Sequence, residues 1–508
     1  MEVMLELFAF GFYNVLMPVN ILAMVVGMLI GLLIGILPGL GGTMAVALII
    51  PFTFSMEPVT GILILISLYC TSTFAGSITA ILFKIPGEAP AIMTILDGHE
   101  MAKRGQAGKA LGMAIFASTL GGVFSTICLA VVSIPLSTVA IEFGDAEYFA
   151  MAVMGLSVCS GIGGKSVLKN VIGAVIGLFL ATFGTSPISG THRFTFGYSG
   201  LLMGITFIPA VIGLFAISEV FEEVERGLKG GQREGYKRQE KVRIGMPSWE
   251  EIKYLKWTFL RSGIIGTIIG ILPGVGATTA AFFGYSEAVR WSKHPEKFGT
   301  GIIEGIAAPE TANNAATGGA MVPLLTLGIP GSSVTAVMIG AFLIHGLRPG
   351  PMMMMQQEKL VYSIFAGYFF SNLLIILAGV LGTKFVARLM DFPYHKVGPA
   401  ILLFAVIGSY AINNSMTDVY VTLAFGFIGY VLKKQGFGLA PMILGMILGD
   451  LAEVSLRRAM LLSDFDPMIL ITRPISAGLI IFAVLSLCYP LIQKYLLKGR
   501  GKEELASS

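Results

Sequence analysis

Two short motifs, each present twice, hold the residues of this chain whose backbone chemistry is unusual. Leu37-Pro38-Gly39-Leu40-Gly41 returns as Leu272-Pro273-Gly274-Val275-Gly276, and Ile85-Pro86-Gly87 returns as Ile329-Pro330-Gly331. The offsets are similar, 235 residues (273 − 38) and 244 residues (330 − 86). Proline removes a backbone donor and glycine relaxes a helix, so each motif should interrupt the apolar run around it. Such breaks in matching positions of two membrane-embedded halves indicate a binding site for a transported solute.

Each predicted break offers backbone groups that bind ions. A half-helix that starts after a break has free amide donors and the positive end of the helix dipole, which suit an anion. Carbonyl groups freed at the break suit a cation. The predicted binding residues at and after the four breaks are Pro38, Gly39, Gly41, Thr43, Pro86, Gly87, Glu88, Pro273, Gly274, Gly276, Thr278, Thr279, Pro330, Gly331, Ser332 and Ser333. The alternative for any single hydroxyl is that it only caps its own helix.

Four further polar residues stand in apolar surroundings. Asn313 and Asn314 offer oxygen ligands for Na⁺, together with the carbonyls of the breaks, and amide donors for a carboxylate; the alternative is hydrogen bonding between helices. Glu310, just upstream, is a weaker candidate for carrying a coupling proton, and an interfacial position is equally open. Lys84 is a functional candidate because charge is costly at membrane depth, unless its amine snorkels to the headgroups.

The composition predicts the elements that must position these residues. The chain has 508 residues, of which 55% are hydrophobic and only 13% charged, and its mean hydropathy is +0.81. Charge-poor apolar stretches long enough to cross a bilayer recur throughout, and we expect roughly 11 to 14 crossings or half-crossings. The predicted fold class is an all-α polytopic membrane protein in contact with lipid. The net charge of +4 is attributed to cytoplasmic loops rather than to a nucleic-acid surface.

Basic residues predict how the two halves are oriented. In the first half, loop 51–60 has no Lys or Arg, whereas 103–109 has three. In the second half the order reverses, because 290–297 has three basic residues and 347–357 has one. Since basic loops stay in the cytoplasm, equivalent loops should face opposite sides of the membrane, as an inverted-topology repeat requires.

The same rule orients the termini. The acidic N-terminus should lie outside, and the basic linker and the basic C-terminus should lie in the cytoplasm. Lys433-Lys434 and Arg457-Arg458 flank one apolar span, so one pair faces outward or the span is re-entrant; the sequence leaves both open.

These observations divide the chain into four parts. Residues 1–221 form the first transmembrane repeat, with broken helices near 38 and 86. A basic cytoplasmic linker follows at 222–255. Residues 256–390 form the core of the second repeat, with breaks near 273 and 330, and 391–508 contain C-terminal transmembrane helices and a cytoplasmic tail.

The motifs and their order also resemble a known family. The resemblance rests on 35–41, 76–82, Pro86-Gly87-Glu88-Ala89, Leu96-Asp97-Gly98, 272–276, 292–296, 304–315, 323–331 and 344–351. This set, spread over nearly the whole chain, is similar to the large membrane subunit of the tripartite tricarboxylate transporters (the TctA family). In one departure, Lys84-Ile85 stands where family members commonly have Asn-Thr, so a tricarboxylate substrate should not be assumed.

The resemblance implies a function and partners. It implies a secondary transporter that works with a small transmembrane subunit and a periplasmic solute-binding protein, in the inner membrane of a prokaryote. It further implies import of an organic carboxylate, coupled to Na⁺ or H⁺, with no cofactor. The identity of the carboxylate, the ion and its stoichiometry stay open, as does assembly into a homo-oligomer.

Other functions remain as alternatives. Within transport, the chain would be a stand-alone carboxylate carrier, or a channel without a binding protein. A membrane enzyme is disfavoured because no ionisable residues cluster with the spacing of a nucleophile and its base. A structural scaffold would leave the doubled breaks unexplained.

Overall fold

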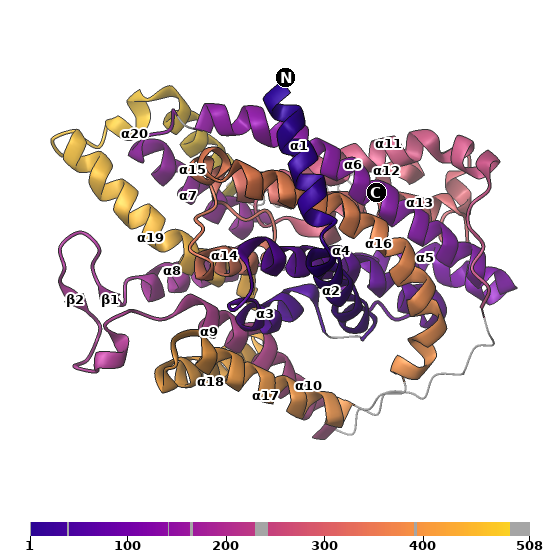
Figure 1. Ribbon diagram of the computed structural model, residues 1–508, viewed down its shortest axis with the longest axis horizontal. Coiled ribbons are helices and arrows are strands. Elements are labelled where there is room, and N and C mark those ends of the chain that lie inside the picture. The colour runs from indigo at the N-terminus through magenta and orange to yellow at the C-terminus, as the bar shows by residue number, and fades with distance from the viewer. Residues whose placement is uncertain are drawn as a thin grey trace, which may run out of the picture.

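The chain folds as a large bundle of helices (Figure 1). The computed structural model describes residues 2–37, 40–140, 142–162, 166–228, 242–390 and 394–487. In this part of the chain, the sheet structure consists of one short antiparallel hairpin, in which β1 (Gly184–Thr185) pairs with β2 (His192–Arg193). The prediction of an all-α fold is confirmed.

The helices follow one another along the chain, with the hairpin between α8 and α9. In the first half they are α1 (Glu2–Val15), α2 (Pro18–Ile36), α3 (Gly42–Thr53), α4 (Pro58–Phe83), α5 (Ile92–Met101), α6 (Ala107–Ala140), α7 (Asp145–Ile162), α8 (Val167–Ala181), α9 (Phe207–Ile212) and α10 (Ser218–Leu228). In the second half they are α11 (Trp249–Ile271), α12 (Gly276–Trp291), α13 (Glu304–Leu327), α14 (Ser333–Ile344), α15 (Pro351–Gln356), α16 (Glu358–Met390), α17 (Tyr394–Asn413), α18 (Met416–Lys434), α19 (Leu439–Leu462) and α20 (Ile469–Thr472). A further short apolar helix covers Pro474–Leu487.

Six helical segments in the described residues are long and apolar enough to cross a membrane. They are Pro18–Ile36, Pro58–Phe83, Ala89–Ala140, Glu358–Phe385, Met416–Lys434 and Leu439–Leu462. Shorter apolar helices, among them α3, α8 and α14, add to these. The chain is therefore a multi-pass membrane protein, while the number of full and half crossings stays a prediction.

The breaks occur where the repeated motifs predict them. Leu37 follows α2 and Leu272 follows α11, and both leave the helix with nearly the same ψ, 114° and 120°. Lys84 follows α4 and Gly328 follows α13, both in the left-handed conformation, with φ of 61° and 71°. Matching residues thus end matching helices, so the repeat in the sequence is a repeat in the structure.

The two repeats run in opposite directions. On α4 and α13, Ser77 contacts Glu310, whereas Cys70 contacts Thr317 seven residues further along α13. Residue numbers in contact rise along α13 while they fall along α4, so these equivalent helices are antiparallel. This arrangement is what an inverted-topology repeat requires.

Glycines bring equivalent helix pairs together at backbone distance. In the first repeat, a Cβ atom on Gly27, Gly31 or Gly35 of α2 would lie within 2.6 Å of a carbonyl oxygen of α4. In the second, a Cβ atom on Gly266 or Gly270 of α11 would lie within 2.4 Å of a carbonyl oxygen of α13. Membrane helices associate through such small-residue faces, because lipid supplies no hydrophobic drive between them.

The outer helices exchange partners between the repeats. α7 and α8 pack against α19, and α17 and α18 pack against α9 and α10. In Figure 1, α17, α18 and α10 lie together along the lower edge, while α19, α8 and the hairpin lie along the left. The helices after 394 therefore pack largely against helices of the first half.

Ion pairs show where Lys433-Lys434 and Arg457-Arg458 lie, which the sequence left open. Lys433 and Lys434, at the end of α18, pair with Glu219 and Glu225 of α10 at 2.5 and 2.7 Å. Arg457 lies near the other end of α19 and pairs with Glu453 at 2.9 Å. With 24 residues, α19 is longer than the ~30 Å hydrocarbon core at ~1.5 Å per residue. The two basic pairs thus flank α19: Lys433-Lys434 end α18 just before its start, and Arg457-Arg458 lie near its end.

Candidate substrate site at the helix breaks

The first and second breaks meet within the first repeat. The backbone N–H of Gly42, at the start of α3, donates to the carboxylate of Glu88. The N–H of Gly87 donates to the carbonyl of Gly76 on α4 at 3.2 Å. A Cβ atom on Gly87 would lie 2.0 Å from the carbonyl oxygen of Gly35, so only glycine fits there. The second break is therefore wedged between α2 and α4, and its glutamate occupies the start of α3.

The third and fourth breaks meet in the same way in the second repeat. The N–H of Gly274 donates to the carbonyl of Gly331 at 3.0 Å. A Cβ atom on Gly331 would lie 2.5 Å from the carbonyl oxygen of Gly270 on α11. Gly274 and Gly276 have φ of 77° and 72°, a conformation in which a side chain is strained. Glycine is thus required on both sides of this contact.

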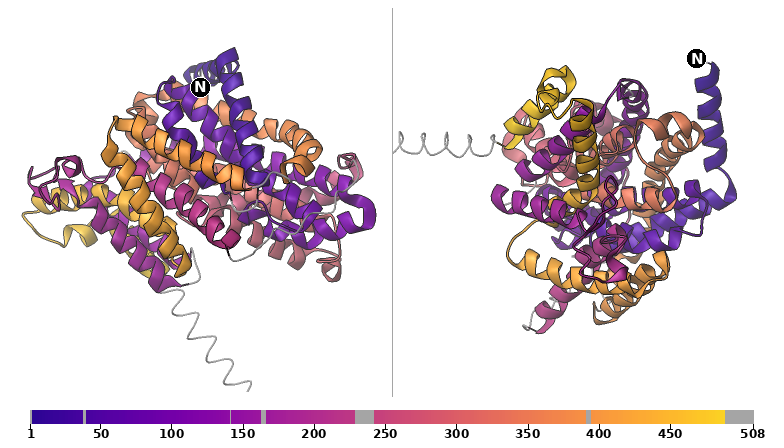
Figure 2. Two further views of the ribbon diagram at one scale, coloured as in Figure 1. Left: turned by 90° about the horizontal axis from the view of Figure 1, so that it is seen from below. Right: turned by 90° about the vertical axis from the view of Figure 1, so that its left-hand side faces the viewer.

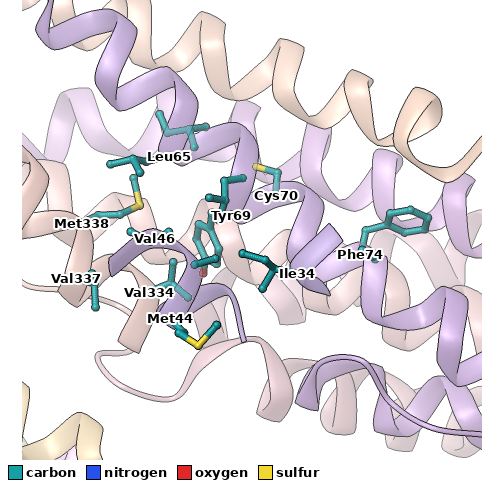
Figure 3. Close-up of a cluster of buried hydrophobic side chains, with 14 of the residues drawn as sticks. Ile34, Met44, Val46, Leu65, Tyr69, Cys70, Phe74, Val334, Val337 and Met338 are labelled. Carbon is teal, nitrogen blue, oxygen red and sulfur yellow. The ribbon is translucent and has the colours of Figure 1, made fainter. Parts of the chain in front are cut away.

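Hydroxyl groups join the first and fourth breaks across the two repeats. The Oγ1 atom of Thr43, on α3, lies 3.1 Å from the Oγ atom of Ser333 on α14. The hydroxyl of Tyr69, on α4, lies 3.2 Å from the Oγ atom of Ser332. Figure 3 shows the Tyr69 ring pointing between the start of α3 and the start of α14. Ser332 also caps α14 through a reciprocal pair with Thr335, so capping and contact between repeats occur together.

The hydroxyls after the third break behave differently. Thr278 is exposed, and the Oγ1 atom of Thr279 donates to the carbonyl of Val275 in its own helix at 3.1 Å. These two residues therefore do not join the hydroxyl contacts between α3, α4 and α14. Pro38 and Gly39 lie outside the described residues, whereas Gly41 lies just before α3 and Pro86, Pro273 and Pro330 lie within their breaks.

The asparagine pair lies in the buried interior of α13. Asn313 and Asn314 are fully buried, and the Nδ2 atom of Asn314 donates to the Oδ1 atom of Asn313 at 2.6 Å. The buried Oδ1 atom of Asn314 has no hydrogen-bond partner in the described part of the chain. A buried acceptor without a partner is rare in proteins, and it is a feature that a ligand could satisfy.

Lys84 points away from these contacts. Its side chain is exposed and interacts electrostatically with Glu100 near the end of α5. Its backbone adopts the left-handed conformation that Gly328 adopts at the equivalent position. The structure thus gives Lys84 the position of a helix end rather than a place among the hydroxyls.

Several residues of the broken-helix region were not predicted. Tyr69 joins the two repeats, and Ser77, Thr94 and Ser118 donate to Glu310. Asp97 on α5 accepts from the N–H groups of Gly301 and Ile302 at 2.8 and 3.0 Å and from the Tyr285 hydroxyl at 2.8 Å. In the sequence these residues stand out only as polar positions within apolar runs. That pattern does not indicate which distant residue each side chain contacts.

Comparisons with known proteins agree with this architecture. The model of the family described as "Tripartite tricarboxylate transporter TctA family" matches residues 21–444. An uncharacterized 52.8 kDa protein in the TAR-I ttuC' 3' region of Agrobacterium vitis is 40% identical over 470 residues, which cover 92% of this chain and 93% of that protein.

A second relative covers less of the chain. An uncharacterized protein in the TAR-II ttuC' 3' region of Agrobacterium vitis is 43% identical over 215 residues, 42% of this chain and 89% of its own length. No solved structure matches significantly. Because the family model spans both pairs of breaks, this chain belongs to the tripartite tricarboxylate transporter TctA family, a family of transporters.

Proposed function

We propose that this protein is a secondary carrier that imports an organic carboxylate with the energy of a Na⁺ or proton gradient. It acts as the large membrane subunit, beside a small transmembrane subunit and a periplasmic solute-binding protein that delivers the substrate. It lies in the inner membrane of a prokaryotic cell, with the N-terminus outside and the C-terminus in the cytoplasm. Family membership supports the assembly, and the breaks support the location of the site.

One observation carries the location of the site. The starts of α3 and α14 come from opposite repeats, yet their hydroxyls meet through Thr43 and Ser333 at 3.1 Å. Each start supplies amide donors and the positive end of a helix dipole, which favour a carboxylate. The Gly42 amide at the start of α3 already donates to the carboxylate of Glu88, so a substrate carboxylate would bind the other amides of the two starts.

The site also offers ligands for a co-transported cation. Asn313 and Asn314 supply amide oxygens in a fully buried position, and the breaks supply carbonyl groups. Na⁺ bound there would offset the charge of the carboxylate. Movement of one repeat against the other would then carry both across the membrane, by analogy with other inverted-repeat carriers.

The test is transport by the purified complex in liposomes. The protein is reconstituted with its small subunit and binding protein, and uptake of radiolabelled citrate and other di- and tricarboxylates is measured under an inward Na⁺ or proton gradient. We expect saturable uptake above the external concentration that stops when the gradient is collapsed. Accumulation that persists without any gradient would refute ion coupling.

The same assay separates the alternatives. A channel gives uptake that follows the concentration gradient without saturation. A stand-alone carrier gives full uptake when the binding protein is omitted, whereas the proposed assembly loses most of its uptake at low substrate concentration.

A further inference from the structure

Glu310, on α13, sits in a cage of hydroxyl groups from three other helices. The residue is fully buried on α13. Its carboxylate accepts from Ser77 of α4 at 2.5 Å, from Ser118 of α6 at 2.8 Å and from Thr94 of α5. Both repeats therefore contribute to one buried acid.

The partners of Glu310 carry no charge. In the described part of the chain, the hydrogen-bond donors to its carboxylate are these three hydroxyls, and no ion pair involves it. An ionised carboxylate at membrane depth without a cation is costly, although hydrogen bonds reduce this cost. A neutral carboxylic acid is free of that cost, so the cage accommodates a proton readily.

The surrounding titratable groups lie outside the cage. The titratable and charged residues of the neighbouring elements are Tyr69 and Cys70 on α4, Lys84 and Glu88 around the second break, Asp97, His99 and Glu100 on α5, Lys109 and Cys128 on α6, Glu250, Glu251, Lys253, Tyr254, Lys256 and Arg261 on α11, Tyr285, Glu287 and Arg290 on α12, and Glu304 on α13. None of these is among the described contacts of the Glu310 carboxylate.

Hydroxyl groups differ from backbone N–H groups because they can both donate and accept hydrogen bonds. A serine or threonine hydroxyl donates one hydrogen bond and can also accept, so it can serve an ionised or a protonated carboxyl by rotating. Asp97 is the contrast within the same α5–α13 contact. Two of its three donors are the backbone N–H groups of Gly301 and Ile302, which cannot accept. The backbone partners of Asp97 thus only donate, whereas the hydroxyl partners of Glu310 can also accept.

The cage is connected to the second break. Ser77 follows Gly76, whose carbonyl accepts from the N–H of Gly87 at 3.2 Å. Thr94 lies on α5, the half-helix that begins after that break. A change in the hydrogen bonds of Glu310 therefore acts directly on the two segments that hold the second break in place.

We propose that Glu310 is the proton-binding group through which this carrier couples carboxylate uptake to the proton gradient. The proposal rests on the carrier function proposed above and names its coupling ion. The proton enters from the outer solution when the site is open to that side. Its binding neutralises Glu310, permits the loaded repeat to move, and is followed by release into the cytoplasm.

The test compares net accumulation with exchange in liposomes that contain the full complex. The Glu310→Gln variant keeps the size and hydrogen bonding of a neutral acid but cannot release a proton. We expect wild-type accumulation under an inward proton gradient, where about one pH unit supports about a ten-fold ratio per proton carried. In Glu310→Gln this accumulation is lost, while exchange of external labelled for internal unlabelled substrate persists and no longer depends on pH.

Glu304→Gln is the matched control. Glu304 is also a buried glutamate of α13, 6% exposed, but its partners are Ser292, just after α12, and Tyr254 of α11. We expect this variant to accumulate substrate as the wild type does. Thermal unfolding of both variants in detergent verifies that each is folded, and Ser118→Ala, which removes one cage donor, should shift the pH dependence of exchange without abolishing it.

The outcomes separate this proposal from the function on which it rests. Proton-driven accumulation by Glu310→Gln at the wild-type level would overturn the role of Glu310 and leave the carrier function intact. Wild-type accumulation driven by Na⁺ alone, with no proton uptake detected by a pH-sensitive dye in the vesicles, would overturn the assignment of the ion. An absence of saturable uptake by the wild type would instead refute the carrier function itself.

Discussion

At the residue scale, the polar side chains near the breaks form contacts between helices that are distant in sequence. Thr43 and Ser333 are 290 positions apart and Tyr69 and Ser332 are 263 positions apart, yet their hydroxyls meet. The sequence predicted that Thr43, Ser332 and Ser333 follow breaks, because proline and glycine act locally. It did not predict Tyr69, since a tyrosine in an apolar run is also common in a packed core.

Tyr69 gives the first prediction at this scale. Tyr69→Phe removes the hydroxyl that contacts Ser332 but keeps the ring between α3 and α14. One hydrogen bond of this kind is worth about 0.5–1.5 kcal/mol, so we expect KM for the carboxylate to rise roughly two- to ten-fold at unchanged expression. Tyr13→Phe, at a position 67% exposed, is the control and should leave KM unchanged. An unchanged KM in Tyr69→Phe would remove Tyr69 from the site.

A second prediction at the residue scale concerns Lys84. Its left-handed backbone costs a residue with a side chain roughly 1–2 kcal/mol relative to glycine. Because Gly328 fills the equivalent position, Lys84→Gly should raise the thermal stability of the protein in detergent and leave carboxylate uptake intact. A loss of uptake at normal stability would show instead that the lysine side chain takes part in transport.

At the element scale, the half-helices α3, α5, α12 and α14 are positioned by glycine contacts with the long helices. Where each helix ends could be predicted, because Leu37, Lys84, Leu272 and Gly328 stand directly before proline-glycine motifs. Which half-helices meet could not be predicted, because that depends on how α4 and α13 cross. The loop charges indicated the antiparallel sense of that crossing but not its register.

The prediction for this scale concerns the fourth break. Gly331→Val forces side-chain atoms into Ala320 and the carbonyl of Gly270, each 2.5 Å from the position of a Cβ atom. We expect the protein to insert into the membrane at normal levels but to lose carboxylate uptake, because α14 is displaced from α3. Uptake is measured in proteoliposomes and insertion by membrane fractionation.

The control for Gly331→Val is the same substitution at a glycine that has free space around it. Gly227 lies near the end of α10, and a Cβ atom there would meet nothing within 4 Å. Gly227→Val should therefore transport normally. Normal uptake by Gly331→Val as well would argue against a site at the breaks.

At the scale of the whole molecule, two antiparallel repeats exchange their outer helices. Figure 2 shows the N-terminal helix α1 projecting at one edge of the bundle in both views. The paired motifs and the loop charges indicated the repeat, but they did not show that α17–α19 pack with α7–α10. These outer helices have no motif that marks their partners, so only the packed structure shows how they associate.

This arrangement predicts which surfaces face each side of the membrane. The segment after β2, which contains Phe196, lies toward the end of α19, because Arg193 pairs with Glu453. Leu228 lies toward the start of α19, and both side chains are more than 80% exposed. In a chain whose four cysteines are replaced, Phe196→Cys should react with an impermeant maleimide added outside, and Leu228→Cys only in inverted vesicles. Reaction of both from one side would contradict the predicted topology.

If the carboxylate binds where the breaks of the two repeats meet, it should shield a cysteine placed there, in a chain without its own cysteines. We expect a transported carboxylate at saturating concentration to slow the reaction of Ser333→Cys with maleimide and to leave that of Phe196→Cys unchanged. An unchanged rate at position 333, under conditions in which the same preparation still transports that carboxylate, would contradict this location of the site.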